Sequence, residues 1–342
     1  MRGQSLKRRS VLGFAAGFMA IAIGGEVALA ADKINVGALR FTSHSASFVA
    51  FERGYFKNNS LDVTFKFFQA AQPMAVAIAS GDVDVGVTAI SGGLINLAKK
   101  GAIKVVGGAL HEEKGVDGQM ILVSKKAYDA GVTSPDKLRG RTYGITQAGS
   151  SFHYMAHKIA QKEGFPGSEI KVKPLQKVGA IIGALKSGQI DAWSIVPHIA
   201  KALSKGPAVV SIGKITDYIP DYQVTTVFTS TKNASQNRDL VKRFLAAFSK
   251  GAADFNAALV DKTAGAEEAE KMVKLIHKYV YTSRPYAKAA PSIRNGAMRI
   301  NKNAALNVTN VRDQLQWFQS EGLVGKDVTI DMLVDKSFVR TY

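Results

Sequence analysis

The sequence predicts an α/β protein built as two lobes with a ligand cleft between them. The first observation is a motif of the form Ser-Gly-x-(Val/Ile)-Asp-(Val/Ala), which occurs at Ser80 to Val85 and again at Ser187 to Ala192, 107 residues later. The second is that neighbouring elements recur at the same offset, as expected for a duplication. The third is that strand and helix patterns alternate, which is typical of mostly parallel sheets. Ligands of such sheets bind beyond the carboxyl ends of the strands, so paired lobes predict a cleft.

Residues Met1 to Ala30 are predicted to be an export signal and are set apart from the fold. A basic head at Lys7, Arg8 and Arg9 precedes an apolar run, and Ala28-Leu29-Ala30 offers a small-x-small cleavage site. Paired arginines followed by Ser and two apolar residues resemble a twin-arginine signal, and an ordinary secretory signal is the alternative. The apolar run is too short for a comfortable membrane span. We therefore expect the mature chain in the periplasm.

Composition excludes several classes of protein and of site. The chain has no cysteine, which rules out disulfides, thiol nucleophiles and cysteine-based metal sites. Removing the export signal lowers the formal net charge from +18 to +15, because four basic residues and one acidic residue leave with it. The basic residues are scattered and no nucleic-acid motif accompanies them. A solvated basic surface that steers anionic solutes is favoured over nucleic-acid binding.

The first lobe is expected to begin with βα units and the second to repeat them. Strands at residues 34–39 and 63–68 and a helix at 48–58 correspond to strands at 141–146 and 170–175 and a helix at 155–165. A helix at 94–100 and a strand at 103–109 complete the first set. We assign residues 32–114 and 228–342 to the first lobe and residues 115–227 to the second.

Two apolar strands are candidates for the crossings between lobes. The first lies at residues 119–124 and the return crossing at 223–230, a segment rich in β-branched residues. Beyond them the pattern turns helical, at 237–259, 267–279 and 304–321. In the last of these Val308, Val311, Leu315 and Phe318 form one apolar stripe. We expect these helices to pack on the first lobe and complete it.

Several segments together resemble a known family. They are Ile34-Asn35-Val36-Gly37, Gly54-Tyr55-Phe56-Lys57 followed by Leu61-Asp62-Val63, Leu138-Arg139-Gly140-Arg141, and the two Ser-Gly-x-x-Asp motifs. In combination the chain resembles the NitT/TauT-type (nitrate, sulfonate, taurine) periplasmic solute-binding proteins of ABC importers, within the NMT1/THI5-like superfamily. The resemblance spans nearly the whole mature chain. It implies the type II periplasmic-binding fold, a two-strand hinge, ligand-driven closure and delivery to a membrane permease.

Loops rich in hydroxyl groups lead into the predicted helices and suggest an anion site without a metal. Helix N-termini carry free N–H groups and partial positive charge, so several of them aimed at one crevice would hold an anion. Ser150 and Ser151 are the strongest candidates for ligand contact, although a purely structural N-cap is the alternative. The candidates from these loops are Thr42, Ser43, Thr88, Gln147, Ser150 and Ser151.

Aromatic and basic side chains near the same strand ends are further candidates. Phe152 and Trp193 could wall an organic ligand, whereas core packing is favoured for Phe41. Arg40 could pair with a carboxylate or sulfonate through its planar guanidinium, or simply be exposed. His44 and His111 lie in loops after strands and could donate to an anion, although each alone is more often a surface histidine.

The sequence thus predicts a monomeric binding protein that captures a small organic anion and presents it to an ABC permease. An aromatic carboxylate such as phthalate, or an organosulfonate, is favoured over nitrate. An enzyme on the same scaffold is the alternative, since the superfamily contains a pyrimidine synthase. That synthase relies on a cysteine-rich segment, which this chain lacks. His153 and His157 have helical i, i+4 spacing without the Glu of a zincin, and no other cofactor motif is present.

Overall fold

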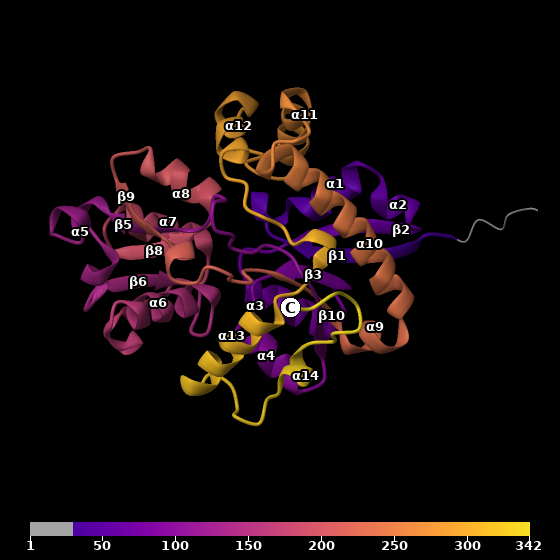
Figure 1. The fold of residues 1–342 in the computed structure, drawn as a ribbon, viewed down its shortest axis with the longest axis horizontal. Coiled ribbons are helices and arrows are strands. Elements are labelled where there is room, and N and C mark those ends of the chain that lie inside the picture. Colours follow the sequence, from indigo (N-terminus) through magenta and orange to yellow (C-terminus); the bar gives the residue numbers. More distant parts are fainter. Residues whose placement is uncertain (1–29) are drawn as a thin grey trace, which may run out of the picture. The chain divides into compact units, whose positions relative to one another are not determined.

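The computed structural model describes residues 30–342 (Figure 1). The predicted export signal therefore lies outside the described residues, apart from Ala30. Within residues 30–342 no helix is long and apolar enough to cross a membrane.

Two separate five-stranded sheets organise the chain. The first has the order β2-β1-β3-β10-β4, and the second has the order β7-β6-β8-β5-β9. The strands of the first sheet are β1 (Asp32–Ala38), β2 (Leu61–Phe67), β3 (Val85–Thr88), β4 (Ile103–Gly108) and β10 (Thr226–Ser230). Those of the second are β5 (Met120–Ser124), β6 (Thr142–Ile145), β7 (Lys171–Pro174), β8 (Ala192–Ile195) and β9 (Val209–Lys214). We call each sheet with the helices that pack on it the first and the second lobe.

The two sheets are built alike, which confirms the predicted repeat. Strands β3 and β8 begin at Val85 and Ala192, which are 107 residues apart, the offset between the two sequence motifs. In each sheet the first three strands in spatial order run parallel, and one antiparallel strand lies beside them. That antiparallel strand is β10 in the first sheet and β5 in the second. The predicted mostly parallel α/β lobes are therefore confirmed.

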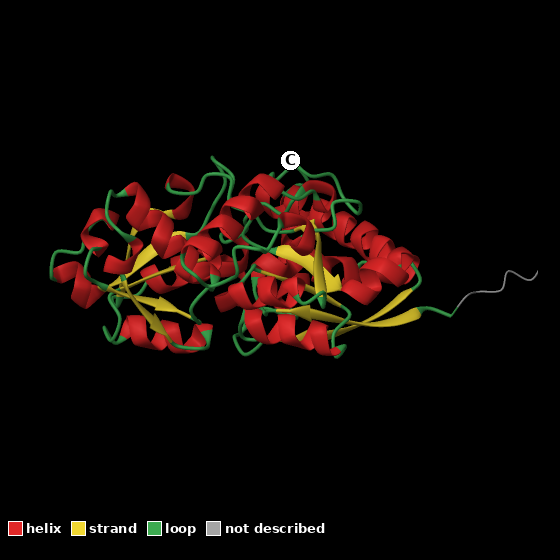
Figure 2. Ribbon diagram, turned by 90° about the horizontal axis from the view of Figure 1, so that it is seen from below, coloured by secondary structure: helices red, strands yellow, loops and turns green. Residues whose placement is uncertain are grey.

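Helices lie on both faces of each sheet (Figure 2). The first lobe carries α1 (Ser45–Glu52), α2 (Tyr55–Asn58), α3 (Ala71–Ser80), α4 (Gly92–Lys99), α9 (Thr231–Gln236), α10 (Arg238–Phe255), α11 (Ala266–His277) and α14 (Ile330–Leu333). The second carries α5 (Lys125–Asp129), α6 (Ser151–Lys162), α7 (Val178–Lys186) and α8 (Pro197–Ser204). The helix predicted at 48–58 is divided in two, because Gly54 adopts a left-handed φ of 72° between α1 and α2.

The helical C-terminal third packs mainly on the first lobe, as predicted. Helix α10 lies along α1, α11 contacts α1, and α14 contacts β4 and α4 (Figure 1). Two further helices, α12 (Tyr286–Arg294) and α13 (Val308–Ser320), also reach the second lobe. Helix α12 packs on both α11 and α8, and Asp313 of α13 accepts a hydrogen bond from Tyr154 Oη of α6 at 2.5 Å.

The two crossings between sheets do not lie where the sequence predicted them. The candidate strands at 119–124 and 223–230 form β5 and β10, which are the antiparallel strands inside the two sheets. The connecting segments precede them, at residues 109–119 and 215–225. These segments run side by side, since Val224 N donates to Leu110 O at 2.9 Å and Glu112 N donates to Tyr222 O at 2.9 Å. The lobe boundaries given above remain a prediction.

Candidate functional site

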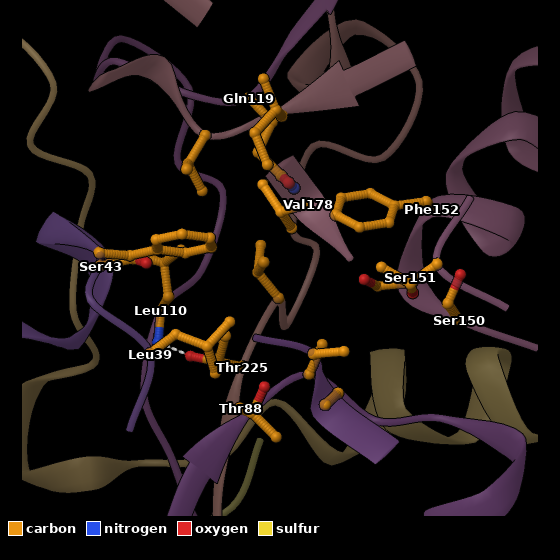
Figure 3. A pocket seen from close by; sticks show the side chains of 18 of the residues that line it. Leu39, Ser43, Thr88, Leu110, Gln119, Ser150, Ser151, Phe152, Val178 and Thr225 are labelled. Atoms are coloured by element: carbon orange, nitrogen blue, oxygen red, sulfur yellow. Dashed lines mark hydrogen bonds between the residues drawn. The ribbon is translucent and has the colours of Figure 1, made fainter. Parts of the chain in front are cut away.

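A cavity lies between the two lobes and is lined by residues of both (Figure 3). The first lobe contributes the end of β1, the end of β3 and the start of α3, and the second contributes the starts of α6, α7 and α8. The connecting segments add Leu110, Gln119, Val224 and Thr225. The cavity volume is about 60 Å³, several times the roughly 10–15 Å³ that one water molecule requires. A small solute can therefore be enclosed by both lobes and by the segments that connect them.

Helix beginnings surround this cavity. Lining residues include His44 before α1, Ala70 before α3, Ser150 before α6, Val178 at the start of α7 and Val196 before α8. Within the described residues, none of these five helices has a side chain that caps its N-terminus. Helix α1 continues a 3-10 turn at Thr42–His44, and Thr42 O accepts from Ser45 N, so its first N–H is satisfied. The uncapped ends of α3, α6, α7 and α8 leave N–H groups and partial positive charge beside the cavity.

Helices that begin away from the cavity include several with side-chain caps. Ser124 Oγ accepts from Ala127 N at 3.1 Å at the start of α5, and Ser230 Oγ accepts from Asn233 N at 3.1 Å at the start of α9. Such caps satisfy the free N–H groups of a helix end. The chain therefore uses serine caps elsewhere, whereas Ser150 stands in the same position at α6 without bonding to the backbone.

The start of α6 is the best-defined donor group of the cavity. Ser150 is 4% exposed, and its Oγ has no hydrogen-bond partner within residues 30–342. No described acceptor is bonded to the backbone N–H of Ser151 or Phe152, the first two residues of the helix. Gly149 reaches this position with a φ of 70°, and its carbonyl accepts from Gly92 N at 2.9 Å across the two lobes. Three donors at one helix end are therefore available to a ligand.

The rest of the lining is largely apolar, with neutral polar groups. Among the described residues that line the cavity there is no Asp, Glu, Lys or Arg. Its polar side chains are Ser43, His44, Thr88, Gln119, Thr146, Ser150, Ser151 and Thr225. Burial lowers the pKa of His44 to about 3, so its imidazole is neutral near pH 7. A bound anion would therefore meet hydrogen-bond donors and helix dipoles but no cationic side chain.

Six of the eleven predicted site residues line the cavity. They are Ser43, His44, Thr88, Ser150, Ser151 and Phe152. In Figure 3 the Phe152 ring and the Ser151 hydroxyl point into the space from one side and Ser43 faces them from the other. These predicted residues therefore stand on two opposing walls, and their contact with a ligand remains a prediction.

The other five predicted residues lie elsewhere, each for a recognisable reason. The guanidinium of Arg40 is exposed, lies 3.8 Å from the ring centroid of Phe67 and donates to Tyr279 O. Trp193 is fully buried and packs edge-on against Phe152 at 5.4 Å, so it supports a lining residue from behind. Thr42 is buried in the turn before α1. The carbonyl of Gln147 accepts a hydrogen bond from Ser150 N. His111 pairs with Gln223 where the two connecting segments run side by side.

Some lining residues were not identified from the sequence. Phe41, expected to be core, lines the cavity and contacts the His198 ring of the second lobe at 5.6 Å. Gln119 and Thr225 also line the cavity, and they lie in the segments 119–124 and 223–230 that were predicted to be crossing strands. Thr146 follows β6 directly, at the carboxyl end of the strand where lining residues are expected.

The two sheets and the cavity between them define a bilobal α/β protein of the type II periplasmic-binding fold. The chain belongs to the NMT1/THI5-like family, whose family model matches residues 41–258. The family resemblance noted in the sequence is thereby confirmed. No curated protein matches the chain.

Solved structures with the same fold cover nearly the whole described chain. The alkanesulfonate-binding protein SsuA from Xanthomonas axonopodis pv. citri, bound to MOPS, has a TM-score of 0.69 at 16% identity, covering 91% of this chain and 98% of its own. The periplasmic aliphatic sulphonate binding protein SsuA from Escherichia coli has a TM-score of 0.68 at 20% identity, covering 90% and 98%. The periplasmic nitrate-binding protein NrtA from Synechocystis PCC 6803 has a TM-score of 0.71 at 12% identity, covering 90% and 87%. At these identities the similarity establishes the fold alone.

Proposed function

We propose that this protein is the substrate-binding component of an ABC importer and captures a small organic anion in the periplasm. The observation that carries the proposal is the set of four uncapped helix beginnings, those of α3, α6, α7 and α8, around one largely apolar cavity. Uncapped N-termini favour negative charge, and apolar walls favour an organic body. The sulfonates and nitrate named for the similar proteins are anions as well.

The absence of charged side chains from the described lining restricts the class of ligand further. A ligand with one negative charge can be neutralised by N–H groups and dipoles, whereas a second charge would be buried without a counterion, at a high cost. An organosulfonate or an aromatic carboxylate fits this description. Phthalate remains in the proposed class when one of its carboxyl groups is protonated or directed to solvent.

Delivery follows from closure in this proposal. The ligand contacts both lobes, so it binds the closed form more tightly and shifts the population toward it. The closed, monomeric protein is then presented to the transmembrane subunits of the permease. Export to the periplasm, by a twin-arginine or an ordinary signal, belongs to the same proposal.

Ligand identification tests the proposal. Native mass spectrometry of the purified protein, followed by denaturation, would reveal what is bound and whether it is released unchanged. A thermal-shift screen would compare alkanesulfonates, benzoate, phthalate and nitrate with choline as the cationic control. We expect organic anions to raise Tm, since a ligand at a hundred times its Kd stabilises by about 2.7 kcal/mol. Stabilisation by choline alone, or by none of the anions, would contradict the proposal.

An enzyme on the same scaffold is the alternative function, and the same experiment separates the two. An enzyme would convert the identified ligand during incubation, and a product of different mass would accumulate. A binding protein returns the ligand with its mass unchanged.

A further inference from the structure

His153 lies beside the anion site at the start of α6 but does not line the cavity. It is the third residue of α6, which begins at Ser151, and it is half-buried. Its ring nitrogen Nδ1 accepts a hydrogen bond from Gly149 N at 3.2 Å. The side chain therefore reaches back over the start of its own helix to the turn that precedes it.

Gly149 is held in this turn from two sides. Its N–H is bonded to His153, and its carbonyl accepts from Gly92 N at 2.9 Å. Gly149 is buried and has a φ of 70°, a left-handed conformation that glycine adopts readily. Because Ser150 and Ser151 follow directly, the conformation of Gly149 sets the direction in which the N–H groups of the helix start point.

The hydrogen bond also defines the protonation of the ring. An imidazole nitrogen accepts an N–H only when it carries no proton, so the proton of the neutral ring is on Nε2. Burial lowers the pKa of His153, which favours the same neutral form near pH 7. The Glu321 carboxylate raises this pKa and the His157 ring lowers it, but burial is the larger effect. The turn is thus held by an uncharged acceptor.

We infer that His153 is a positioning residue of the anion site, which holds the turn at Gly149 with an acceptor that carries no negative charge. The inference rests on the proposed function and deepens it, because it names the residue that arranges the donors of Ser151 and Phe152. His153 acts through the turn, since it lies outside the cavity lining.

The physical reason is a conflict between two uses of a helix start. In the capping box the third residue of a helix is Glu or Gln, and its side chain accepts from a backbone N–H before the helix. A carboxylate there is also favoured by the helix dipole. In this protein the same dipole is needed for the ligand, and a carboxylate at residue 153 would repel a bound anion. A neutral histidine holds the turn and leaves the positive end of α6 to the ligand.

Contacts with α13 hold the ring in place. The ring of His153 meets the indole of Trp317 at right angles, with 5.2 Å between the ring centroids. His157, one turn later in α6, contacts the same indole at 5.8 Å. The N–H of Gly149, however, is bonded to His153. His157 is therefore a matched control, because it shares the aromatic contact and not the bond to the turn.

The test uses replacements that separate the hydrogen bond from the charge. The Oδ1 atom of Asn takes the place of Nδ1, so His153→Asn keeps a neutral acceptor. His153→Asp keeps the acceptor and adds a negative charge, and His153→Leu removes the acceptor. Calorimetry on the mature chain near pH 7 measures the binding of benzoate, phthalate and propane-1-sulfonate. Urea unfolding without ligand measures the stability of each variant.

The three variants should differ in affinity and in stability. His153→Asn should bind within about threefold of the wild type, and His153→Leu about tenfold more weakly, the scale of one lost hydrogen bond. His153→Asp should bind at least about tenfold more weakly than His153→Asn because of the added charge. Without ligand, however, His153→Asp should be at least as stable as His153→Asn, since a carboxylate is favourable at a helix start. A loss of structure alone would lower affinity and stability together.

Controls keep the outcomes distinct. His157→Asn makes the same replacement one turn later and should leave the affinity nearly unchanged. The inference is overturned, while the proposed function stands, if His153→Leu binds like the wild type or if His153→Asp binds as tightly as His153→Asn. Should the Leu variant fail to fold, the comparison of Asn with Asp decides. If none of the three probes binds the wild type, the proposed function itself fails.

Discussion

Gly296 lies directly against the backbone of His198, and a β-carbon on Gly296 would fall 2.2 Å from His198 Cβ and 2.3 Å from its Cα. His198 belongs to α8 of the second lobe, whereas Gly296 follows α12, which packs on α11 of the first. Beside them, Tyr281 Oη donates to His198 O at 3.1 Å. The lobes therefore touch between α8 and the end of α12 through a contact that has no room for a side chain.

Gly296→Ala should consequently hinder closure. The added methyl group meets backbone atoms that cannot rotate away, so the lobes must stay slightly apart. We expect the affinity for the tightest organic anion of the screen to fall at least about tenfold. Gly183→Ala, in α7, is the matched control because a β-carbon there meets nothing within 4 Å. Equal affinities of the two variants would show that the contact at Gly296 is not needed for binding.

Ser150→Ala combined with Ser151→Ala should weaken binding and leave the free protein nearly as stable. The Ser150 hydroxyl bonds to nothing in the described chain, so its removal costs the unliganded fold at most about 1–2 kcal/mol, the scale of a lost cap. A hydrogen bond to a charged group contributes about 1.5–3 kcal/mol, so affinity should fall tenfold or more. Calorimetry and urea unfolding measure the two effects.

Ser124→Ala provides the converse control. Ser124 caps α5, away from the cavity. The Ser124→Ala variant should lose about 1 kcal/mol of unfolding free energy and should bind the anion as tightly as the wild type. A double variant at Ser150 and Ser151 that binds as tightly as Ser124→Ala would refute the assignment of the anion site.

Two buried histidines should make the protein less stable in acid. Burial lowers the pKa of His44 and of His198 to about 3, against 6.5 for an exposed imidazole. Below pH 6.5 the unfolded chain therefore binds protons that the folded chain excludes, and stability is lost as the pH falls from about 6.5 toward 3. Each histidine contributes a slope of up to about 1.4 kcal/mol per pH unit.

Urea unfolding of His198→Leu between pH 7.5 and 5 measures this contribution. As the pH falls, the free energy of unfolding of the variant should decrease less steeply than that of the wild type. The difference in slope should correspond to about one proton. Burial raises the pKa of Glu112 to about 7, which acts in the opposite sense but equally in both proteins. Identical slopes would mean that His198 is protonated in the folded state.

The aspartates of the two repeated motifs accept the same backbone hydrogen bond and should stabilise the fold. Asp84 Oδ2 accepts from Asn35 N at 2.8 Å, and Asp191 Oδ2 accepts from Thr142 N at 2.8 Å, at the same offset in the chain. Asp191 also accepts from Thr142 Oγ1 at 2.8 Å. Asp191→Ala should therefore lower the free energy of unfolding by about 2–3 kcal/mol.

Asp82→Ala is the control for that measurement. Asp82 lies in the same motif but is exposed, and its replacement should change stability by no more than about 0.5 kcal/mol. Similar losses at Asp82 and Asp191 would contradict the role given to the buried hydrogen bonds.

The fold could be predicted because the repeat carries local signals. The Ser-Gly-x-x-Asp motif combines a helix end with a strand start, and Gly81 and Gly188 take the left-handed φ values of 87° and 70° that such a helix end favours. The crossings were misplaced for a physical reason. An apolar strand has the same sequence pattern whether it crosses between lobes or pairs within a sheet. The pairing depends on distant residues, since β10 pairs with residues of β3 more than a hundred positions away.

The site could be predicted only where a loop enters a helix. Ser150, Ser151 and Phe152 are such residues, and all three line the cavity. Gln119 carries no local signal, because its place depends on how the connecting segment passes the cavity. The side chain of Arg40 was free to point either way, and it lies on Phe67 outside the lining.

The most direct test of the central claim is a crystal structure of the mature protein with the tightest organic anion of the screen. The account predicts that anion oxygens lie within hydrogen-bond distance of the N–H groups of Ser151 and Phe152, with the organic body against the Phe152 ring. An anion bound outside this cavity, or with its charged group turned away from the start of α6, would contradict it.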